Sequence, residues 1–186
     1  MARINGLSYA PEFLTADKHD RLAQAIDGHG WQQSGQMKRL VQQYGFAYNH
    51  QAQNQRPERV EPFPSWLETL AVLVAQIGKF GRKPDQAIIN RYAPGEGIGP
   101  HLDFTRHFGD TVASVSLLSD AVMDFTSVED RTQTLPVLLE RGSAVILTGD
   151  ARYRWKHGIA LRHIDRYKDR EIQRGTRYSV TFRTML

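Results

Sequence analysis

Residues 177–183 have the sequence Arg177-Tyr178-Ser179-Val180-Thr181-Phe182-Arg183, which alternates strictly between polar and apolar side chains. A period of two is typical of a β-strand that has one face in an apolar core. The other face of this strand carries two arginines and two hydroxyl groups. If it lies inside the protein, the arginines need an anion, because a buried and unpaired charge is costly. A dicarboxylate ligand would supply one, since a guanidinium binds a carboxylate through two hydrogen bonds. The alternative is an exposed sheet face with two hydrated arginines.

Short β-rich runs separated by Gly, Pro and Asp precede this strand. We predict strands over Ala87–Tyr92, Val112–Leu118, Ala121–Thr126, Leu135–Glu140 and Ser143–Thr148. Before them we predict two amphipathic helices, one over Ala16–Asp27 with Thr15 as its cap and one that begins at Ser65 and ends near Lys79. Two helices followed by six or more short strands predict an α+β fold, in which the helices support one face of a double-sheet jelly roll.

Residues 30–60 differ in composition from the rest of the chain. They contain eight glutamines together with the aromatic residues Trp31, Tyr44, Phe46 and Tyr48. This mixture is too polar for a core and too aromatic for a simple linker. We interpret the segment as a surface lid or hairpin that stacks on a flat partner.

The size and composition of the chain limit its class. With 186 residues, 40% of them hydrophobic, and no linker or repeat, we expect one domain over residues 1–186. The chain has no cysteine, which excludes disulfides, zinc–thiolate sites, iron–sulfur clusters and thiol nucleophiles. No apolar run is long enough to cross a bilayer, and the N-terminus lacks the apolar core of a signal peptide. We therefore expect a cytoplasmic monomer without membrane partners.

Positive charge is concentrated toward the C-terminus. Residues 150–186 contain 10 Lys and Arg against 4 Asp and Glu, a net charge of +6, whereas residues 1–149 contain 14 against 16, a net charge of −2. This asymmetry favours polyanions or anionic small molecules as partners, although a hydrated basic face is the more common cause of any single cluster.

Three residues form a candidate metal site. His101 and Asp103 are two positions apart, so on an extended strand both side chains leave the same face, and His157 from a later strand would complete the set. Two histidines and one carboxylate are typical of non-haem Fe(II) sites, where open positions admit a chelating cosubstrate and dioxygen together. Zinc fits this donor set less well, and a His-x-Asp pair also arises by chance.

Two other histidines are weaker candidates for metal binding. His107 lies close to Asp103 in the sequence, but residues 108–110 are expected to form a loop. His163 lies in a basic stretch and is expected at the surface.

A further polar pair lies on the predicted strand before the candidate metal site. Asn90 and Tyr92 alternate around Arg91, so their side chains share a face. Their amide and hydroxyl groups would help Arg177 to hold a carboxylate. The alternative is an ordinary strand end with a polar edge.

Taken together, these motifs resemble those of the AlkB family of Fe(II)- and 2-oxoglutarate-dependent dioxygenases. The resemblance covers about half of the chain, and its motifs follow the order of the family. They are Asn90-Arg91-Tyr92-Ala93-Pro94-Gly95, His101-Leu102-Asp103, Ser114-Val115-Ser116-Leu117, Gly149-Asp150-Ala151-Arg152, Trp155-Lys156-His157-Gly158-Ile159 and the run from Arg177 to Arg183. The resemblance implies a double-stranded β-helix with N-terminal helices and a nucleotide-recognition lid.

The same resemblance implies the cofactors and their ligands. It implies that Fe(II) is bound by His101, Asp103 and His157, and that 2-oxoglutarate is bound by Asn90, Tyr92, Arg177, Ser179 and Arg183. Arg177 would face the distal carboxylate of 2-oxoglutarate, and Arg183 would lie near the carboxylate beside the metal. With dioxygen, the family oxidises a substrate C–H bond and forms succinate and CO₂. On an N-alkyl group, the oxidised carbon then leaves as an aldehyde.

The substrate implied by the resemblance is an alkylated base in single-stranded DNA or RNA, because an enzyme cannot reach a base stacked in a duplex. The stacking candidates in the expected lid are Trp31, Phe46 and Tyr48. Expected contacts to phosphate groups are Arg39, Arg152, Arg154, Lys156 and Arg162. Thr105 lies two residues past Asp103, where the bacterial repair enzyme of the family has an acidic residue that contacts the base, so substrate preference cannot be transferred at this position.

Two alternatives remain open. Several motifs, among them Lys83-Pro84-Asp85-Gln86 and Val122-Met123-Asp124-Phe125, are similar to those of family members that hydroxylate a modified wobble uridine in tRNA. The other alternative is a non-catalytic module that binds nucleic acid or protein on the same scaffold. The complete set of metal ligands argues against the second alternative.

Overall fold

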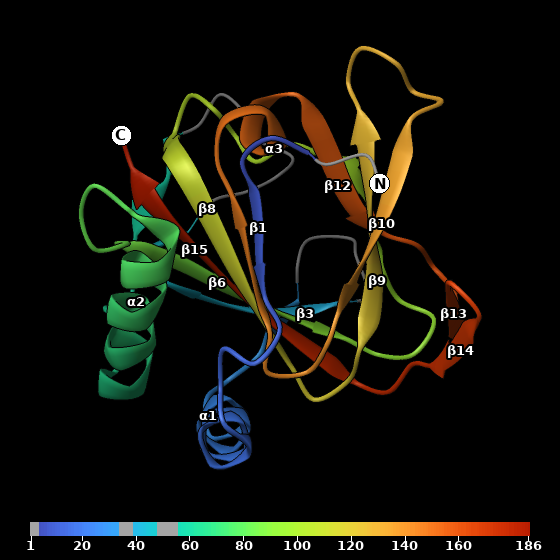
Figure 1. Ribbon diagram of the computed structural model, residues 1–186. Coiled ribbons are helices and arrows are strands. Elements are labelled where there is room, and N and C mark those ends of the chain that lie inside the picture. The colour runs from blue at the N-terminus through green and yellow to red at the C-terminus, as the bar shows by residue number, and fades with distance from the viewer. Residues whose placement is uncertain (1–3, 34–38, 48–55) are drawn as a thin grey trace.

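Two antiparallel β-sheets dominate the computed structural model, which describes residues 4–33, 39–47 and 56–186 (Figure 1). The larger sheet contains β1 (Leu7–Ala10), β2 (Gln32–Gln33), β3 (Leu40–Tyr44), β6 (Gln86–Tyr92), β8 (Phe108–Leu117), β11 (Ala144–Leu147) and β15 (Arg177–Met185). The smaller sheet contains β7 (Ile98–His101), β9 (Ala121–Ser127), β10 (Thr134–Leu139) and β12 (Trp155–Ile159). The strand orders are β1-β11-β8-β15-β6-β3-β2 and β10-β9-β12-β7.

Short hairpins and helices complete the described part of the fold. The hairpins are β4 (Phe46–Ala47) with β5 (Glu58–Arg59), and β13 (Ile164–Tyr167) with β14 (Arg170–Gln173). The helices are α1 (Ala16–Asp27), α2 (Ser65–Gly78) and α3 (Gly149–Tyr153). Both predicted helices are confirmed, and the Thr15 hydroxyl caps α1 by accepting a hydrogen bond from the backbone N–H of Lys18. No helix within these ranges has the length and apolarity needed to cross a membrane.

The two faces of the larger sheet have different neighbours. One face packs against α1 and α2 to form the main apolar core, to which Tyr178, Val180 and Phe182 of β15 contribute. The opposite face turns toward the smaller sheet, and a cavity lined by residues of both sheets lies between them. Arg177 and Arg183 line this cavity and are only 3% and 4% exposed. The predicted two-faced strand is therefore confirmed, and the alternative of an exposed arginine face is wrong.

The pairing of β15 with its neighbours decides which residues share the cavity. Arg177 lies opposite Tyr92 of β6, and Ser179 lies opposite Asn90. Residues directly opposite each other on paired strands project from the same face of a sheet. Asn90 and Tyr92 therefore face the cavity together with Arg177, as their alternation predicted.

Part of the expected lid is a strand of the larger sheet. β3 pairs with β6, and its residues Gln42 and Tyr44 are buried. The amide of Gln42 donates to the backbone carbonyls of Ile26 and His29 at the end of α1, at 2.9 and 3.2 Å. Because a glutamine with satisfied hydrogen bonds can be buried, the expectation that this segment is too polar for a core is wrong for residues 40–44.

The loop expected at residues 108–110 is instead the beginning of β8. Gly109, which suggested a turn, is buried where β8 passes close to β15. A Cβ atom at this position would lie 2.4 Å from the side-chain oxygen of Thr184. The glycine therefore permits close packing between two strands, a role that a single sequence does not separate from a turn.

Gly45 joins β3 to β4 with a φ of +73°, a conformation that strongly favours glycine. A Cβ atom here would lie 2.0 Å from the carbonyl oxygen of Asp85. We expect Gly45→Ala to lower the free energy of unfolding by roughly 1–3 kcal/mol, because the backbone would be strained and its neighbour displaced. Urea denaturation followed by circular dichroism measures the change. Gly30→Ala is the matched control, since a Cβ there meets no atom within 4 Å. Equal losses in both variants would contradict this prediction.

Candidate active site

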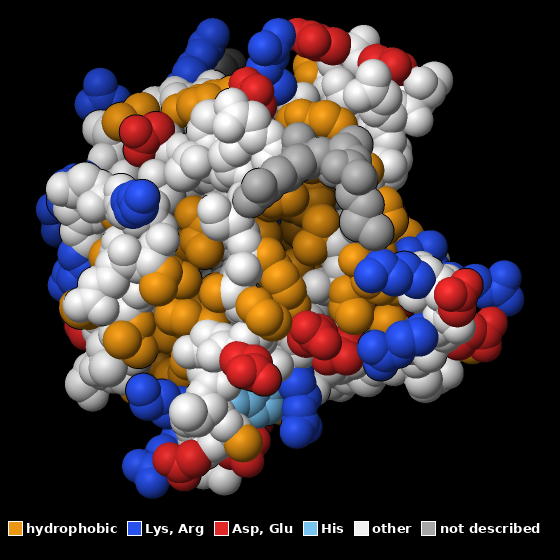
Figure 2. Space-filling model, in the orientation of Figure 1, with side chains coloured by type: hydrophobic (Ala, Val, Ile, Leu, Met, Phe, Trp, Pro, Cys, Tyr) orange, Lys and Arg blue, Asp and Glu red, His pale blue; other side chains and the backbone are white. Residues whose placement is uncertain are grey.

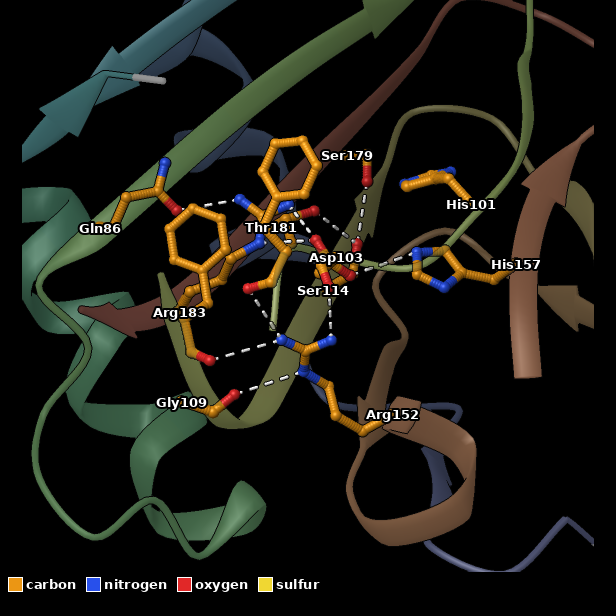
Figure 3. A network of polar contacts seen from close by, with 12 residues as sticks. Gln86, His101, Asp103, Gly109, Ser114, Arg152, His157, Ser179, Thr181 and Arg183 are labelled. Carbon is orange, nitrogen blue, oxygen red and sulfur yellow. Dashed lines mark hydrogen bonds and ion pairs between the residues drawn. The ribbon is translucent and has the colours of Figure 1, made fainter. Parts of the chain in front are cut away.

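The end of β7 and the neighbouring strand β12 bring three potential metal ligands together (Figure 3). His101 is the last residue of β7 and lies directly opposite His157 of β12. Asp103 follows two residues after His101, just beyond the strand. One ligand atom from each of the three residues lies within 4.8 Å of the other two. The predicted triad is thus assembled, and neither His107 nor His163 joins such a group in the described ranges.

Hydrogen bonding selects the ligand atom of His101. Its Nδ1 lies 3.0 Å from the carbonyl oxygen of Gly99. Because a carbonyl can only accept, Nδ1 carries the proton and the lone pair is on Nε2. In His157, Nε2 lies 3.5 Å from Oδ2 of Asp103. That oxygen is buried and accepts no hydrogen bond from the residues that the structure describes. A buried carboxylate oxygen beside two imidazoles suits a divalent cation.

Arg183 holds the other carboxylate oxygen of Asp103. The guanidinium Nε and Nη2 lie 2.7 and 2.5 Å from Oδ1, and Nη1 donates to Oε1 of Gln86 at 2.9 Å. All three side chains are buried. The sequence suggested that both arginines of the C-terminal strand need an external anion, but Arg183 has Asp103 as its counter-ion. This pairing holds the carboxylate so that Oδ2 faces the histidines (Figure 3).

Arg152 of α3 holds the backbone of the same loop (Figure 3). Its side chain is buried, and its guanidinium donates to the carbonyl oxygen of Asp103 at 2.8 Å. The guanidinium also lies 3.3 to 3.5 Å from the carbonyl oxygens of Phe104, Phe108 and Gly109. Because these contacts are inside the protein, the predicted contact between Arg152 and a phosphate is wrong. The residue instead positions Asp103 from the backbone side.

The charges around the triad favour the ionisation states that bind a metal. Burial would raise the pKa of Asp103, but Arg183 and the two histidines bring that pKa well below its usual range. Burial lowers the pKa of His157 to about 3, and the neighbouring His101 acts in the same direction. At neutral pH, Asp103 is therefore a carboxylate and His157 a neutral imidazole, which are the forms that coordinate a cation.

A second polar group lines the cavity next to the triad. Arg177 donates through Nη2 to the Ser116 hydroxyl at 2.8 Å, but its Nε has no partner in the described part of the chain. Burial lowers the pKa of Arg177 to about 10, so the side chain is still a cation at neutral pH. The Tyr92 ring centroid lies 5.8 Å from its guanidinium carbon, and the Asn90 side-chain oxygen is also buried without a described partner. Ser179 lines the same cavity. The arrangement suits an anionic ligand with oxygen acceptors.

The predicted aromatic contacts to substrate differ in their surroundings. Trp31 packs at the edge of the main core, where its ring centroid lies 5.3 Å from that of Tyr178. Phe46 is half-buried, and the guanidinium carbon of Arg59 lies 5.2 Å from the centroid of its ring. Tyr48 lies outside the described residues. Phe46 thus has the greater freedom to contact a ligand, because Trp31 already packs against the core.

The predicted polar contacts to substrate are also divided. Thr105 is exposed in the loop after Asp103, and Arg154 is exposed but forms ion pairs with two acidic side chains. Arg39 is 3% exposed and lines the cavity, so it lies inside the protein and not on its outer surface.

The positive charge of residues 150–186 is split between the interior and the surface. Four of its ten basic residues are buried, namely Arg152, Arg174, Arg177 and Arg183. On the β13–β14 hairpin, Lys and Arg side chains lie beside Asp and Glu side chains (Figure 2). On the face shown there, the hairpin is of mixed charge. The net charge of +6 of residues 150–186 therefore overstates the attraction of this face for a polyanion.

Gln86 is a residue of the site that sequence reasoning missed. It is fully buried, lies opposite Arg183 in the β6–β15 pair and accepts one of its hydrogen bonds. A buried polar residue at the beginning of an apolar strand was the available signal. Its meaning depends on the register between two strands that lie far apart in the sequence.

Comparison with known proteins decides the family. Residues 6–183 match the family model described as the 2OG-Fe(II) oxygenase superfamily, where 2OG stands for 2-oxoglutarate. The chain belongs to this superfamily. It is 30% identical over 96% of its length to the tRNA (carboxymethyluridine(34)-5-O)-methyltransferase ALKBH8 of Macaca fascicularis, of which it covers 30%. It is 29% identical over 94% of its length to the alkylated DNA repair protein ALKBH8 homolog of Arabidopsis thaliana, of which it covers 56%.

These relatives confirm the AlkB family that the motifs predicted, and the chain is an AlkB-type dioxygenase. The solved structure of OsALKBH1 has the same fold, with a TM-score of 0.76 and 17% identity over 99% of this chain and 100% of that one. This agreement confirms the predicted jelly roll. The cofactors of the family are Fe(II) and 2-oxoglutarate. The triad fits the metal, since it has a buried carboxylate oxygen without a hydrogen bond, and the unpaired Nε of Arg177 fits a carboxylate.

Proposed function

We propose that this AlkB-type dioxygenase oxidises N-alkylated bases in single-stranded DNA or RNA, so that the alkyl carbon leaves as an aldehyde. The observation that carries the proposal is the metal triad, whose two histidines line a cavity together with Arg177, a cation without a carboxylate partner among the described residues. The Arabidopsis relative is named for the repair of alkylated DNA, which supports alkylated bases as the substrate class.

In this proposal the triad and its supports prepare the metal site. His101, Asp103 and His157 hold Fe(II). Arg183 occupies one oxygen of Asp103 so that the other, which would bind the metal, lies on the side of His157, and Arg152 holds the Asp103 backbone. When bound, Fe(II) and 2-oxoglutarate supply the oxidation of a substrate C–H bond by dioxygen. The contribution of the protein is to orient these ligands before the reaction begins.

The cavity next to the metal site holds 2-oxoglutarate. Arg177 binds its distal carboxylate, while Asn90, Tyr92 and Ser179 offer hydrogen-bonding groups on the same sheet face. Apolar side chains form much of the remaining wall, namely Ile88, Ile98, Val112, Met123, Val145, Leu147 and Ile159. Because these side chains exclude water, the attraction between Arg177 and a carboxylate is stronger here than at the surface.

Substrate recognition takes place outside this cavity. A base must be unpaired or flipped out to reach a buried metal. Phe46 offers a ring on which a base stacks. Arg154 offers an exposed cation for a phosphate group, and Thr105 offers a hydroxyl group two residues from a metal ligand. These residues are the contacts that we propose for a single strand, in a protein that acts as a monomer in the cytoplasm.

Hydroxylation of a wobble uridine in tRNA is a second candidate function. The macaque relative is named for a modified uridine of tRNA. The match to that relative extends over 96% of this chain, which supports tRNA as a second substrate class.

Succinate and formaldehyde release separates these functions. The protein is reconstituted with Fe(II) without oxygen and then given 2-oxoglutarate and dioxygen. The substrates are oligonucleotides carrying N1-methyladenine or N3-methylcytosine, and tRNA with modified wobble uridines. We expect substrate-dependent succinate with equal amounts of formaldehyde on a methylated oligonucleotide.

Other outcomes of this assay are equally informative. Succinate with a hydroxylated tRNA base and no formaldehyde would establish the second candidate function. No substrate-dependent succinate with any nucleic acid, from protein that retains Fe(II), would contradict both candidate functions.

A further inference from the structure

Arg39 is a buried cation that the described residues leave unpaired. Its side chain is 3% exposed, and none of its three guanidinium nitrogens has a hydrogen-bond partner in the described ranges. Three other buried arginines differ sharply. Arg183 and Arg174 are paired with the carboxylates of Asp103 and Asp165, and Arg152 donates to backbone carbonyls. A buried guanidinium without acceptors is unfavourable, so an anionic partner is needed.

Strand pairing directs Arg39 into the cavity. Val41 of β3 lies opposite Asn90 of β6, and residues two apart on a strand share a face. Arg39 therefore lies on the cavity side, next to Tyr92. Its guanidinium carbon is 5.9 Å from the centroid of the Tyr92 ring, and the guanidinium carbon of Arg177 is 5.8 Å from the same centroid. Two guanidinium groups thus lie close to one tyrosine.

Both guanidinium groups have unsatisfied donors in the same space. Nε of Arg177 and all three guanidinium nitrogens of Arg39 are buried without described partners, and the side chain of Asn90 lines the same cavity. Neither arginine forms an ion pair with a described Asp or Glu. Two guanidinium groups that line one cavity from the segments on either side of Tyr92 favour an anion in that cavity. A carboxylate fits because its two oxygens accept several hydrogen bonds at once.

We propose that Arg39 binds the distal carboxylate of the cosubstrate together with Arg177, and so makes the pocket selective for dicarboxylic 2-oxo acids. The inference rests on the proposed placement of that carboxylate at Arg177. It replaces the contact to nucleic-acid phosphate that the sequence suggested for Arg39, because the side chain is buried on the cavity side of the sheet.

Binding without turnover tests this role. The protein is loaded with Mn(II) under nitrogen, and calorimetry gives the dissociation constants of 2-oxoglutarate and of 2-oxobutyrate, which lacks the distal carboxylate. We expect Arg39→Ala to raise the dissociation constant of 2-oxoglutarate about 10-fold or more. We expect the dissociation constant of 2-oxobutyrate to stay within about 2-fold of the parent value. Arg39→Lys, which keeps the charge, is expected to lie between the alanine variant and the parent. Arg166→Ala, which removes an exposed arginine of the β13–β14 hairpin, is the matched control for net charge and is expected to change neither constant.

The variants separate this inference from the proposed function. Arg177→Ala tests the placement of the distal carboxylate itself. Unchanged 2-oxoglutarate affinity in that variant would overturn both the placement at Arg177 and the role of Arg39. If Arg177→Ala weakens 2-oxoglutarate but Arg39→Ala does not, the placement stands and the role of Arg39 is wrong. Equal weakening of both 2-oxo acids by Arg39→Ala would also overturn selectivity, because it would indicate a general change in the pocket. Loss of affinity for single-stranded oligonucleotide alone would assign Arg39 to the substrate.

Discussion

Replacing His101 with alanine is expected to abolish 2-oxoglutarate turnover. His101 supplies one of three ligand atoms that lie within 4.8 Å of one another, and among the described residues no histidine besides His101 and His157 belongs to that group. Loss of a residue that merely supports a metal ligand lowers affinity about 10–100-fold. We therefore expect loss of the ligand itself to lower Fe(II) affinity and succinate formation by more than about 100-fold. Iron retained after anaerobic reconstitution and desalting, together with succinate formed, measures the effect.

His107→Ala is the matched control for this prediction. His107 is the histidine that the sequence places closest after Asp103, but its ring lies against Phe104, with centroids 6.2 Å apart, and it is outside the triad. We expect this variant to retain iron and to form succinate at close to the parent rate. If both alanine variants lose iron equally, the assignment of the triad is wrong.

Arg152→Met is expected to have the largest effect on stability. The substitution keeps much of the side-chain volume but removes the donors that face the carbonyl oxygens of Asp103, Phe104, Phe108 and Gly109. A buried acceptor left without a donor costs about 1–3 kcal/mol. The Phe104 oxygen keeps the backbone N–H of Phe108 as a donor, but the other three acceptors lose the donor that Arg152 supplies, so we expect the free energy of unfolding to fall by about 3 kcal/mol or more. Urea denaturation of the metal-free protein measures this change directly.

The same substitution is expected to weaken metal binding. Without Arg152 the loop that carries Asp103 is less well fixed, and we expect Fe(II) affinity to fall about 10–100-fold. Arg154→Met is the matched control, because Arg154 lies two residues away with its side chain 57% exposed and its ion pairs at the surface. Surface pairs of this kind contribute at most about 1 kcal/mol. A parent-like stability and iron affinity in Arg152→Met would contradict the role assigned to this residue.

The sequence predicted those parts of the site that depend on local periodicity. The alternation in residues 177–183 separates a core face from a cavity face, because a strand turns successive side chains to opposite sides. The same alternation predicted that Asn90 and Tyr92 share one face, and strand pairing shows that Arg177 projects from that face too. His101 and Asp103 were found by their spacing, although β7 ends at His101 and the convergence of their side chains depends on the loop that Arg152 holds.

The residues that the sequence did not explain depend on pairing between distant segments. Gln86 supports the site because it lies opposite Arg183, and Arg39 enters the cavity because β3 pairs with β6. Neither register is visible in one sequence. Gln42 was misinterpreted for another reason, since composition records that a side chain is polar but not that backbone carbonyls at the end of α1 accept its hydrogen bonds.

The two-faced strand β15 has a consequence for how the gene can vary. The strand is held between β6 and β8, with its apolar residues in the main core and its arginines in the cavity. Deleting a single codon within residues 177–183 would shift the register by one position and exchange the two faces. Arginine would enter the core, and valine and phenylalanine would replace the groups that bind the anion. Insertions and deletions are tolerable in exposed hairpin turns such as that between β13 and β14. A change of length within residues 177–183 would therefore disrupt the apolar core and the anion-binding cavity together.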